Sequence, residues 1–403
     1  MRRQFNGKRL KEALQFRGKR LSDLADEIGI SKQSLSLYAN GDNIPPYDNV
    51  AKIALSLAFP VDFFMTEDTC NVTTYNTYFR SQMSAKKLDQ NAQKVKMEYV
   101  AKIYEALLRY VDVPKLNIPD VSFEDSDNIL KVDSDEQLSR IEIIAMGLRH
   151  HWKLGDGPIE NLQYILESNG IVVTGFKDVD DRIDAFSQRI HIENQGVVFT
   201  VALGIGSKPD CRLKFDMAHE LGHILLHDWD DGNECLNKDE FAALEKQANM
   251  FASAFLMPRA SFGRDVIPYA NKVEYYRALK AKWGVSIQAM MYRARQLDII
   301  TANQFQYMMR TVSSNGWRIR EPGDTPGKLN ATIFQGALDV LFESNYSSPD
   351  SFIKDLYDQG ICLSQRDLED ILGLKEGTLN VNTKKEKLAK LKIEQSRTEA
   401  NVE

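Results

Sequence analysis

The chain has 403 residues, which is enough for two or three domains that each bury their own core. Its formal net charge of −6 argues against a protein whose whole surface coats nucleic acid, and no apolar run reaches the roughly 18 to 20 residues of a membrane span. The basic N-terminus lacks the apolar stretch of a secretory signal, and the four cysteines show no CxxC spacing, so we expect reduced thiols in a cytoplasmic protein.

Basic residues are concentrated at the start of the chain, where residues 2–20 contain eight Lys or Arg and a single acid. The stretch LSDLADEIGI that follows has its apolar residues on one helical face, and Gly29 then provides a turn. Ser31 is placed to cap a second helix, which Gly41 ends. Two short helices around a glycine turn are typical of a helix-turn-helix. We therefore predict an all-α domain that binds DNA in residues 1–65.

The stretch LSDLADEIGISKQSLSLYANGDNIPP resembles the XRE (Cro/C1-type) helix-turn-helix. This resemblance implies that the second helix lies in the major groove of a double-stranded DNA operator, with its first turn against the bases. The side chains expected to face the bases are Lys32, Gln33, Ser34 and Ser36. Those expected to contact phosphates are Lys8, Arg9, Lys19 and Arg20. Those interpreted as core are Ile30, Leu35 and Leu37. A helical module that binds a protein and no DNA is the alternative.

The rest of the chain divides by composition. Residues 66–134 have the character of a helical linker, because a helical pattern gives way to VPKLNIPDVSFEDSDN, with two prolines and an acidic run. From 135 to 310 we expect a compact α+β domain, in which the stretches IVVTGF, IHIE and VVFTVALG are predicted strands. Residues 311–403 begin at a turn-rich hinge and continue as a helical segment for regulation or homodimerisation. The predicted fold class is α+β.

The segment FDMAHELGHILLH contains three of the six histidines of the chain. His219 and His223 are four residues apart, so a helix puts both imidazoles on one face, close enough to bind one ion. Glu220 can reach a water molecule bound to that ion. Zinc lowers the pKa of this water toward about 7, and Glu220 can take the proton of the water. His227 is not expected to be a ligand, because eight residues of helix place it about 12 Å from His219. Histidines on the surface of an amphipathic helix are the alternative interpretation.

The third ligand has to come from another element. Many downstream acids lie in a polar stretch that would not hold them still: Asp228, Asp230, Asp231, Glu234, Asp239 and Glu240. Glu245 is different, because it lies in an amphipathic helix near the apolar face. Ala248 and Ala252 are small enough to let this helix approach the HELGH helix, and Asn249 is placed to orient a ligand. Zinc is the expected ion and manganese the alternative. The predicted metal ligands are His219, His223 and Glu245.

Several segments together resemble the ImmA/IrrE metallopeptidases over roughly residues 135–310: DAFS, RLKFDMAHELGHILLH, LEKQANMFASAFLMP and WGVSIQAMMYRARQL. The resemblance implies the same metal ligands, with Glu220 as the general base. It also implies a gluzincin-like fold with a small antiparallel sheet, whose edge strand, here 196–203, holds an extended substrate peptide by β-augmentation. Many relatives have the residues EAN where this chain has QAN (247–249). The residue that differs, Gln247, is not a predicted metal ligand.

A peptidase also needs a group that stabilises the oxyanion of the tetrahedral intermediate. Chemically suitable side chains follow the third ligand, and the sequence does not choose among them. They are Tyr269, Tyr275, Tyr276, Tyr292 and Arg293.

The order of motifs indicates a function. A helix-turn-helix followed by FRS, GPIENL, HELGH and GWRIREPGDTP resembles regulators in which both modules are fused. In related systems the two are separate proteins, and the peptidase cleaves a repressor to release a stress, prophage or mobile-element programme. We therefore expect a transcriptional regulator carrying a zinc endopeptidase of narrow specificity, whose substrate is a repressor-like protein or its own linker. Two hypotheses compete: a ligand-sensing regulator that does not cleave, and a plain metallopeptidase whose front module docks on a protein.

Overall fold

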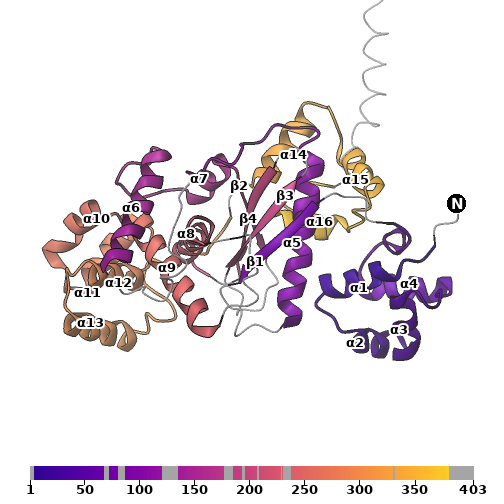
Figure 1. Cartoon of the computed structure of the whole chain (residues 1–403), viewed down its shortest axis with the longest axis horizontal. Coiled ribbons are helices and arrows are strands. Elements are labelled where there is room, and N and C mark those ends of the chain that lie inside the picture. The colour runs from indigo at the N-terminus through magenta and orange to yellow at the C-terminus, as the bar shows by residue number, and fades with distance from the viewer. Residues whose placement is uncertain are drawn as a thin grey trace, which may run out of the picture.

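Figure 1 shows the computed structural model of the chain, in which helices gather around one sheet. The residues that the structure describes are 4–67, 72–79, 87–119, 135–176, 185–192, 196–206, 208–227, 229, 237–329 and 332–380. Within these ranges, no helix has both the length and the apolar character that crossing a membrane requires. The combination of helical segments and one sheet confirms the α+β class.

The N-terminal elements are all helical, as predicted. They are α1 (Gly7–Phe16), α2 (Leu21–Ile28), α3 (Lys32–Asn40), α4 (Tyr47–Leu57) and the 3₁₀ turn η1 (Val61–Met65). Gly29 and Gly41 both adopt left-handed backbone, with φ of 68° and 80°, and end α2 and α3. The Ser31 hydroxyl accepts the backbone N–H of Ser34 and so caps α3. Local turn chemistry therefore fixes the angle between the two helices of the motif.

In the part of the chain that the structure describes, the sheet has four strands in the order β1-β3-β4-β2. They are β1 (Val72–Phe79), β2 (Ile171–Phe176), β3 (Ala185–Ile192) and β4 (Gly196–Gly204). β3 runs antiparallel to β1 and β4, whereas β2 runs parallel to β4. The expected antiparallel sheet is therefore mixed. The expectation that 196–203 is an edge strand is wrong, because β4 lies between β3 and β2.

The two faces of the sheet bury two different cores. Successive side chains of a strand point to opposite faces, so in β4 Phe199 and Val201 join one core while Val198 and Ala202 join the other. The first core receives the α-helices of 135–314: α6 (Asp135–His151), α7 (Leu162–Ser168), α8 (Asp210–Leu226), α9 (Lys238–Leu256), α10 (Arg259–Val266), α11 (Val273–Trp283), α12 (Ile287–Gln296) and α13 (Ala302–Ser314). The 3₁₀ turn η4 (Ile267–Tyr269), which follows α10, buries none of its residues.

The second core packs the N-terminal helices of the chain against its C-terminal helices. It contains the helix-turn-helix together with α5 (Lys87–Leu107), α14 (Ile333–Glu343), α15 (Pro349–Asp358) and α16 (Gln365–Leu372). The guanidinium of Arg17, the residue that follows α1, donates to both carboxylate oxygens of Asp367 in α16, at 2.5 and 2.7 Å. Arg9 donates to the carbonyl of Gly360 at 2.8 Å. The segment 66–134, expected as a helical linker, also supplies β1 to the sheet.

Candidate metal centre and helix-turn-helix surface

The close approach of α8 and α9 creates the candidate metal centre. A Cβ on Gly222 would lie 3.1 Å from the Cα and 3.2 Å from the carbonyl oxygen of Ala248, so a glycine facing an alanine lets the two backbones approach this closely. Ala248 and Ala252 are both fully buried. This agrees with the prediction that small residues of the second helix allow the contact. One turn before Ala248, Glu245 projects toward α8.

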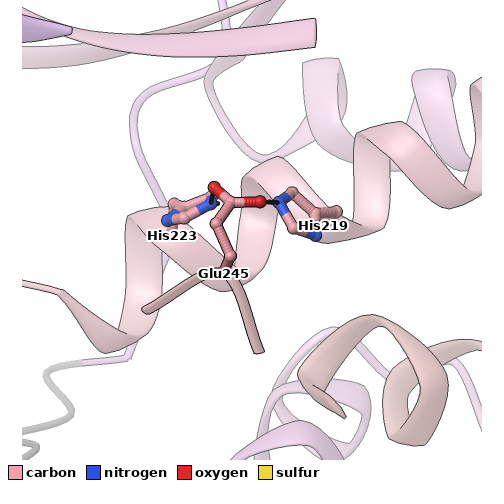
Figure 2. A group of neighbouring side chains, drawn as sticks. All are labelled: His219, His223 and Glu245. Carbon is pink, nitrogen blue, oxygen red and sulfur yellow. Dashed lines mark hydrogen bonds and ion pairs between the residues drawn. The ribbon is translucent and has the colours of Figure 1, made fainter. Parts of the chain in front are cut away.

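Three predicted ligands meet at one point (Figure 2). The Nε2 atoms of His219 and His223 are 3.0 Å apart. Glu245 Oε2 lies 3.3 Å from the first of these nitrogens, and Oε1 lies 3.2 Å from the second. Both histidines are buried, and the Glu245 side chain is 16% exposed. The structure thus brings together His219, His223 and Glu245 on one side of α8.

These distances suit a small cation. An ion with tetrahedral bonds of about 2.0 Å holds its ligand atoms about 3.3 Å apart. Two neutral imidazoles would direct nitrogen lone pairs at each other and at a carboxylate, which is repulsive unless a proton or a metal ion lies between them. Burial raises the pKa of Glu245, but the adjacent His219 and His223 outweigh this effect and hold that pKa below its usual range, so the side chain is a carboxylate. The donor set therefore fits a divalent metal.

Asn249 orients the first of these histidines. Its Nδ2 donates to the backbone carbonyl of Glu245 at 2.7 Å, which directs its Oδ1 toward His219 Nδ1 at 3.2 Å. Since Oδ1 only accepts, the His219 proton lies on Nδ1 and the lone pair lies on Nε2, facing the other ligands. Asn249 therefore occupies the orienting position expected from the sequence.

His227 lies behind the metal centre and offers no ligand atom to it. Its Nδ1 is 2.8 Å from His223 Nδ1, and its Nε2 is 3.1 Å from Gln247 Oε1. Burial, reinforced by the neighbouring His223, lowers the pKa of His227 well below its ordinary value. His227 stands outside the group of predicted ligands, as its spacing from His219 indicated; its contact with Gln247 was not foreseen.

Glu220 is fully buried and has a partner that sequence reasoning missed. Ser187 Oγ donates to Glu220 Oε2 at 2.7 Å. The odd-numbered residues of β3 face the core that contains α8, as Ala185 does, and this alternation places Ser187 above the helix. That alternation, read together with the DAFS motif, was the available signal. Asp184, the first residue of the motif, lies outside the described residues.

The candidate oxyanion groups are mostly engaged elsewhere. Tyr275 and Tyr276 donate their hydroxyls to the backbone carbonyls of Asp265 and Ala270. Arg293 is fully buried and donates to the Met257 carbonyl and to Glu142. Tyr269 packs against Tyr275, and Tyr292 packs against Phe305. These contacts give Tyr275, Tyr276 and Arg293 structural roles.

The first turn of α3 presents polar side chains to solvent. Lys32, Gln33 and Ser36 are exposed, while Ser34 is half-buried with its hydroxyl 2.8 Å from that of Ser31. Lys32 has Asp26 at 3.7 Å, but its side chain is 59% exposed. The expectation that Leu37 is a core residue is wrong, since it is 38% exposed.

The expected phosphate contacts differ in how accessible they are. Lys8 and Arg20 are exposed, and half-buried Lys19 forms a 2.7 Å ion pair with Glu27. Arg9 is only 2% exposed, and its guanidinium donates to Glu12, to Tyr99 and to the Gly360 carbonyl. The expectation that Arg9 binds phosphate is therefore wrong, because the side chain is used inside the second core.

Two family models match the chain. Residues 169–295 match the IrrE N-terminal-like domain of the M78 peptidases, and residues 10–64 match the helix-turn-helix model. The first range contains α8 and α9, and the second contains α2 and α3. Both matches agree with the resemblances drawn from the sequence. No curated protein matches the chain.

Proposed function

We propose that the protein is a DNA-binding transcriptional regulator with a metal-dependent endopeptidase of narrow specificity. The proposal is supported by the match to an IrrE-like peptidase domain that follows a match to a helix-turn-helix domain. The protein cleaves a repressor-like protein or itself in the cytoplasm, in a stress, prophage or mobile-element response. One observation carries the enzymatic part: a buried carboxylate, Glu220, is held by Ser187 beside a complete set of two histidines and a glutamate. A site that only sensed a ligand has no need of Glu220.

The roles of the side chains follow from their positions. His219, His223 and Glu245 would hold Zn²⁺, with Mn²⁺ as the alternative. When bound, the ion supplies a Lewis acid that polarises the peptide carbonyl and lowers the pKa of a water toward about 7. Glu220 takes the proton of the attacking water and gives it to the leaving amine. Ser187 orients that carboxylate through its hydrogen bond.

The position of β1 supports the chain's own linker as a substrate. β1 belongs to residues 66–134 and pairs antiparallel with β3, with Tyr78 opposite Ser187 in the register. An extended backbone therefore lies next to the strand whose serine contacts the proposed general base. Cleavage in this segment would separate the DNA-binding domain from the metal centre.

The four parts of the chain have separate proposed roles. Residues 1–65 bind a double-stranded operator, and residues 135–310 perform the cleavage. Residues 66–134 connect them, and residues 311–403 regulate the protein or mediate homodimerisation. The Arg17–Asp367 ion pair supports a regulatory role, because it joins the DNA-binding domain to α16.

The test compares wild type with Glu220→Gln in the presence of zinc. Purified full-length proteins are incubated with candidate repressors, and fragments of both the repressor and the chain are followed by mass spectrometry. Glu167→Gln is the matched control, since Glu167 is also buried but accepts the backbone N–H of Ile333 away from the metal centre. We expect wild type and Glu167→Gln to cut and Glu220→Gln to be inactive.

The peptidase proposal would be contradicted if wild type binds zinc and yet gives only the fragments that Glu220→Gln also gives. In that case the ligand-sensing regulator is the better account of the chain.

A further inference from the structure

A buried path of hydrogen-bonding groups leads away from one metal ligand. His223 Nδ1 contacts His227 Nδ1 at 2.8 Å, and His227 Nε2 contacts Gln247 Oε1 at 3.1 Å. His223 and Gln247 are essentially inaccessible to solvent, and His227 is 9% exposed. α9 thus contributes two side chains here: Glu245, a proposed metal ligand, and Gln247, which contacts His227.

The direction of each hydrogen bond follows from the end of the path. An amide oxygen only accepts, so Gln247 Oε1 requires the proton of His227 to lie on Nε2. His227 Nδ1 then carries a lone pair and accepts from His223 Nδ1–H. The remaining nitrogen of His223, Nε2, keeps the lone pair that a metal ion needs.

The opposite orientation of the amide would have the opposite effect. If Gln247 Nε2 faced His227, the proton of His227 would move to Nδ1 and that of His223 to Nε2, where it blocks metal binding. The amide of Asn249, behind His219, is fixed at both ends because its Nδ2 donates to the Glu245 carbonyl. Among the described residues Gln247 Nε2 has no hydrogen-bond acceptor, so the contact of Oε1 with His227 is the one hydrogen bond of this amide in the structure.

We propose that Gln247 and His227 are positioning residues that set the tautomer of His223 and, through it, the metal affinity of the protein. The inference rests on the metal site of the proposed function and goes beyond it by assigning two residues that are not ligands. A carboxylate at position 247 accepts from His227 with either oxygen, so Gln247→Glu preserves the path. Gln247→Met keeps the volume and removes the acceptor.

The experiment is a zinc titration of the full-length metal-free protein against a chromophoric chelator. We expect Gln247→Met to bind zinc roughly 10- to 100-fold more weakly than wild type. Gln247→Glu should bind at least as tightly as wild type. The control is Gln335→Met, which removes another buried glutamine, one that bonds Asp339 of α14 and Thr378 of the turn after α16. It should lower stability and leave zinc affinity unchanged.

A second set of variants separates positioning from folding. His227→Phe keeps a ring of similar size without Nδ1, and should weaken zinc binding as Gln247→Met does. Because both changes interrupt one path, the double variant should be no weaker than the weaker single variant. Each protein is also loaded with Co²⁺, whose visible spectrum reports the geometry of the ligands, and a variant that only lost stability would keep the wild-type spectrum.

The outcomes distinguish this proposal from the proposed function. Unchanged zinc affinity in Gln247→Met, or affinity in Gln247→Glu as weak as in Gln247→Met, would overturn the positioning role alone. Additive losses in the double variant would also overturn it. A wild type that binds no metal would overturn the metal site and the positioning role together, whatever the cleavage experiment shows.

Discussion

The helix α8, which carries the two histidines of the candidate metal centre, and the exposed helix α3 present their candidate functional side chains in two different ways. Every residue of α8 from Asp216 to Leu226 is buried, so each functional side chain is held by neighbours from β3 or α9. In α3 only Leu35, Tyr38 and Ala39 are buried, and the polar first turn faces solvent. The proposed role of α8 therefore depends on contacts within the protein, whereas the proposed role of α3 depends on the partner. Substitutions should have large effects in the first helix and small ones in the second.

The largest effect is expected at Glu245. Glu245→Gln removes the negative charge that offsets the ion and one of three ligands, so stoichiometric zinc binding and cleavage should both be lost. Metal content after dialysis, measured by atomic emission, checks this. The control is Glu240→Gln on the same helix, because Glu240 accepts the backbone N–H of Asn237 at the exposed start of α9. This variant should keep its metal. Equal metal content in the two variants would remove Glu245 from the site.

Gly222 comes next, because it sets the distance between α8 and α9. In Gly222→Ala the new Cβ meets backbone of Ala248 and the Phe251 ring at 3.1–3.2 Å. The helices must separate, which should cost about 1–3 kcal/mol of the free energy of unfolding and weaken zinc binding. Urea unfolding of the metal-free protein measures the first effect.

The matched control is Gly336→Ala in α14, where a Cβ would have open space. That change should stabilise the protein by about 0.5–1 kcal/mol, as removing a glycine from a helix usually does. If Gly222→Ala behaved like Gly336→Ala, close packing of the two helices would not be required for the metal centre.

Ser187→Ala should have a smaller effect, and on turnover alone. The hydroxyl donates to a carboxylate, and a hydrogen bond to a charged group contributes about 1.5–3 kcal/mol. We expect kcat to fall at least about tenfold while zinc affinity stays unchanged, because Ser187 contacts Glu220 and no ligand atom is involved in that bond. Thr200→Val, in the next strand but with its hydroxyl on the Gln188 carbonyl, is the control. A parallel loss of zinc affinity in Ser187→Ala would mean that the serine supports the fold of the site and not its base.

The contrast between local and distant contacts also explains what the sequence could predict. His219 and His223 lie one helical turn apart, so their geometry follows from the helix alone, and Glu245 needed only the further argument that small residues let α9 approach. The order of the strands depends on partners far away in the chain. β1 comes from the segment between the two domains and β2 pairs parallel to β4, so the position of 196–203 inside the sheet could not be inferred from its own residues.

The same reasoning applies to single side chains. A basic residue in a basic segment was expected to face phosphate, but Arg9 is drawn inside by Tyr99 of α5 and by the carbonyl of Gly360. Those partners are 90 and 351 residues away in the sequence, so the residues around Arg9 do not predict them. Ser187 and Gln247 were missed for the same reason, since each acquires its role from a residue on another element or at a distant position.

The smallest effects are expected on α3, and they should separate affinity from specificity. Lys32→Ala should weaken binding to the protein's own promoter region a few-fold and lower the salt dependence of affinity by about one ion. Gln33→Ala should instead reduce discrimination between operator and unrelated DNA, by about 1–3 kcal/mol if the amide reads a base. Lys354→Ala, which removes an exposed lysine from α15, is the control for charge. Gel shifts at several salt concentrations decide the matter: equal losses on operator and unrelated DNA in both α3 variants would leave α3 as a helix that contacts only the DNA backbone.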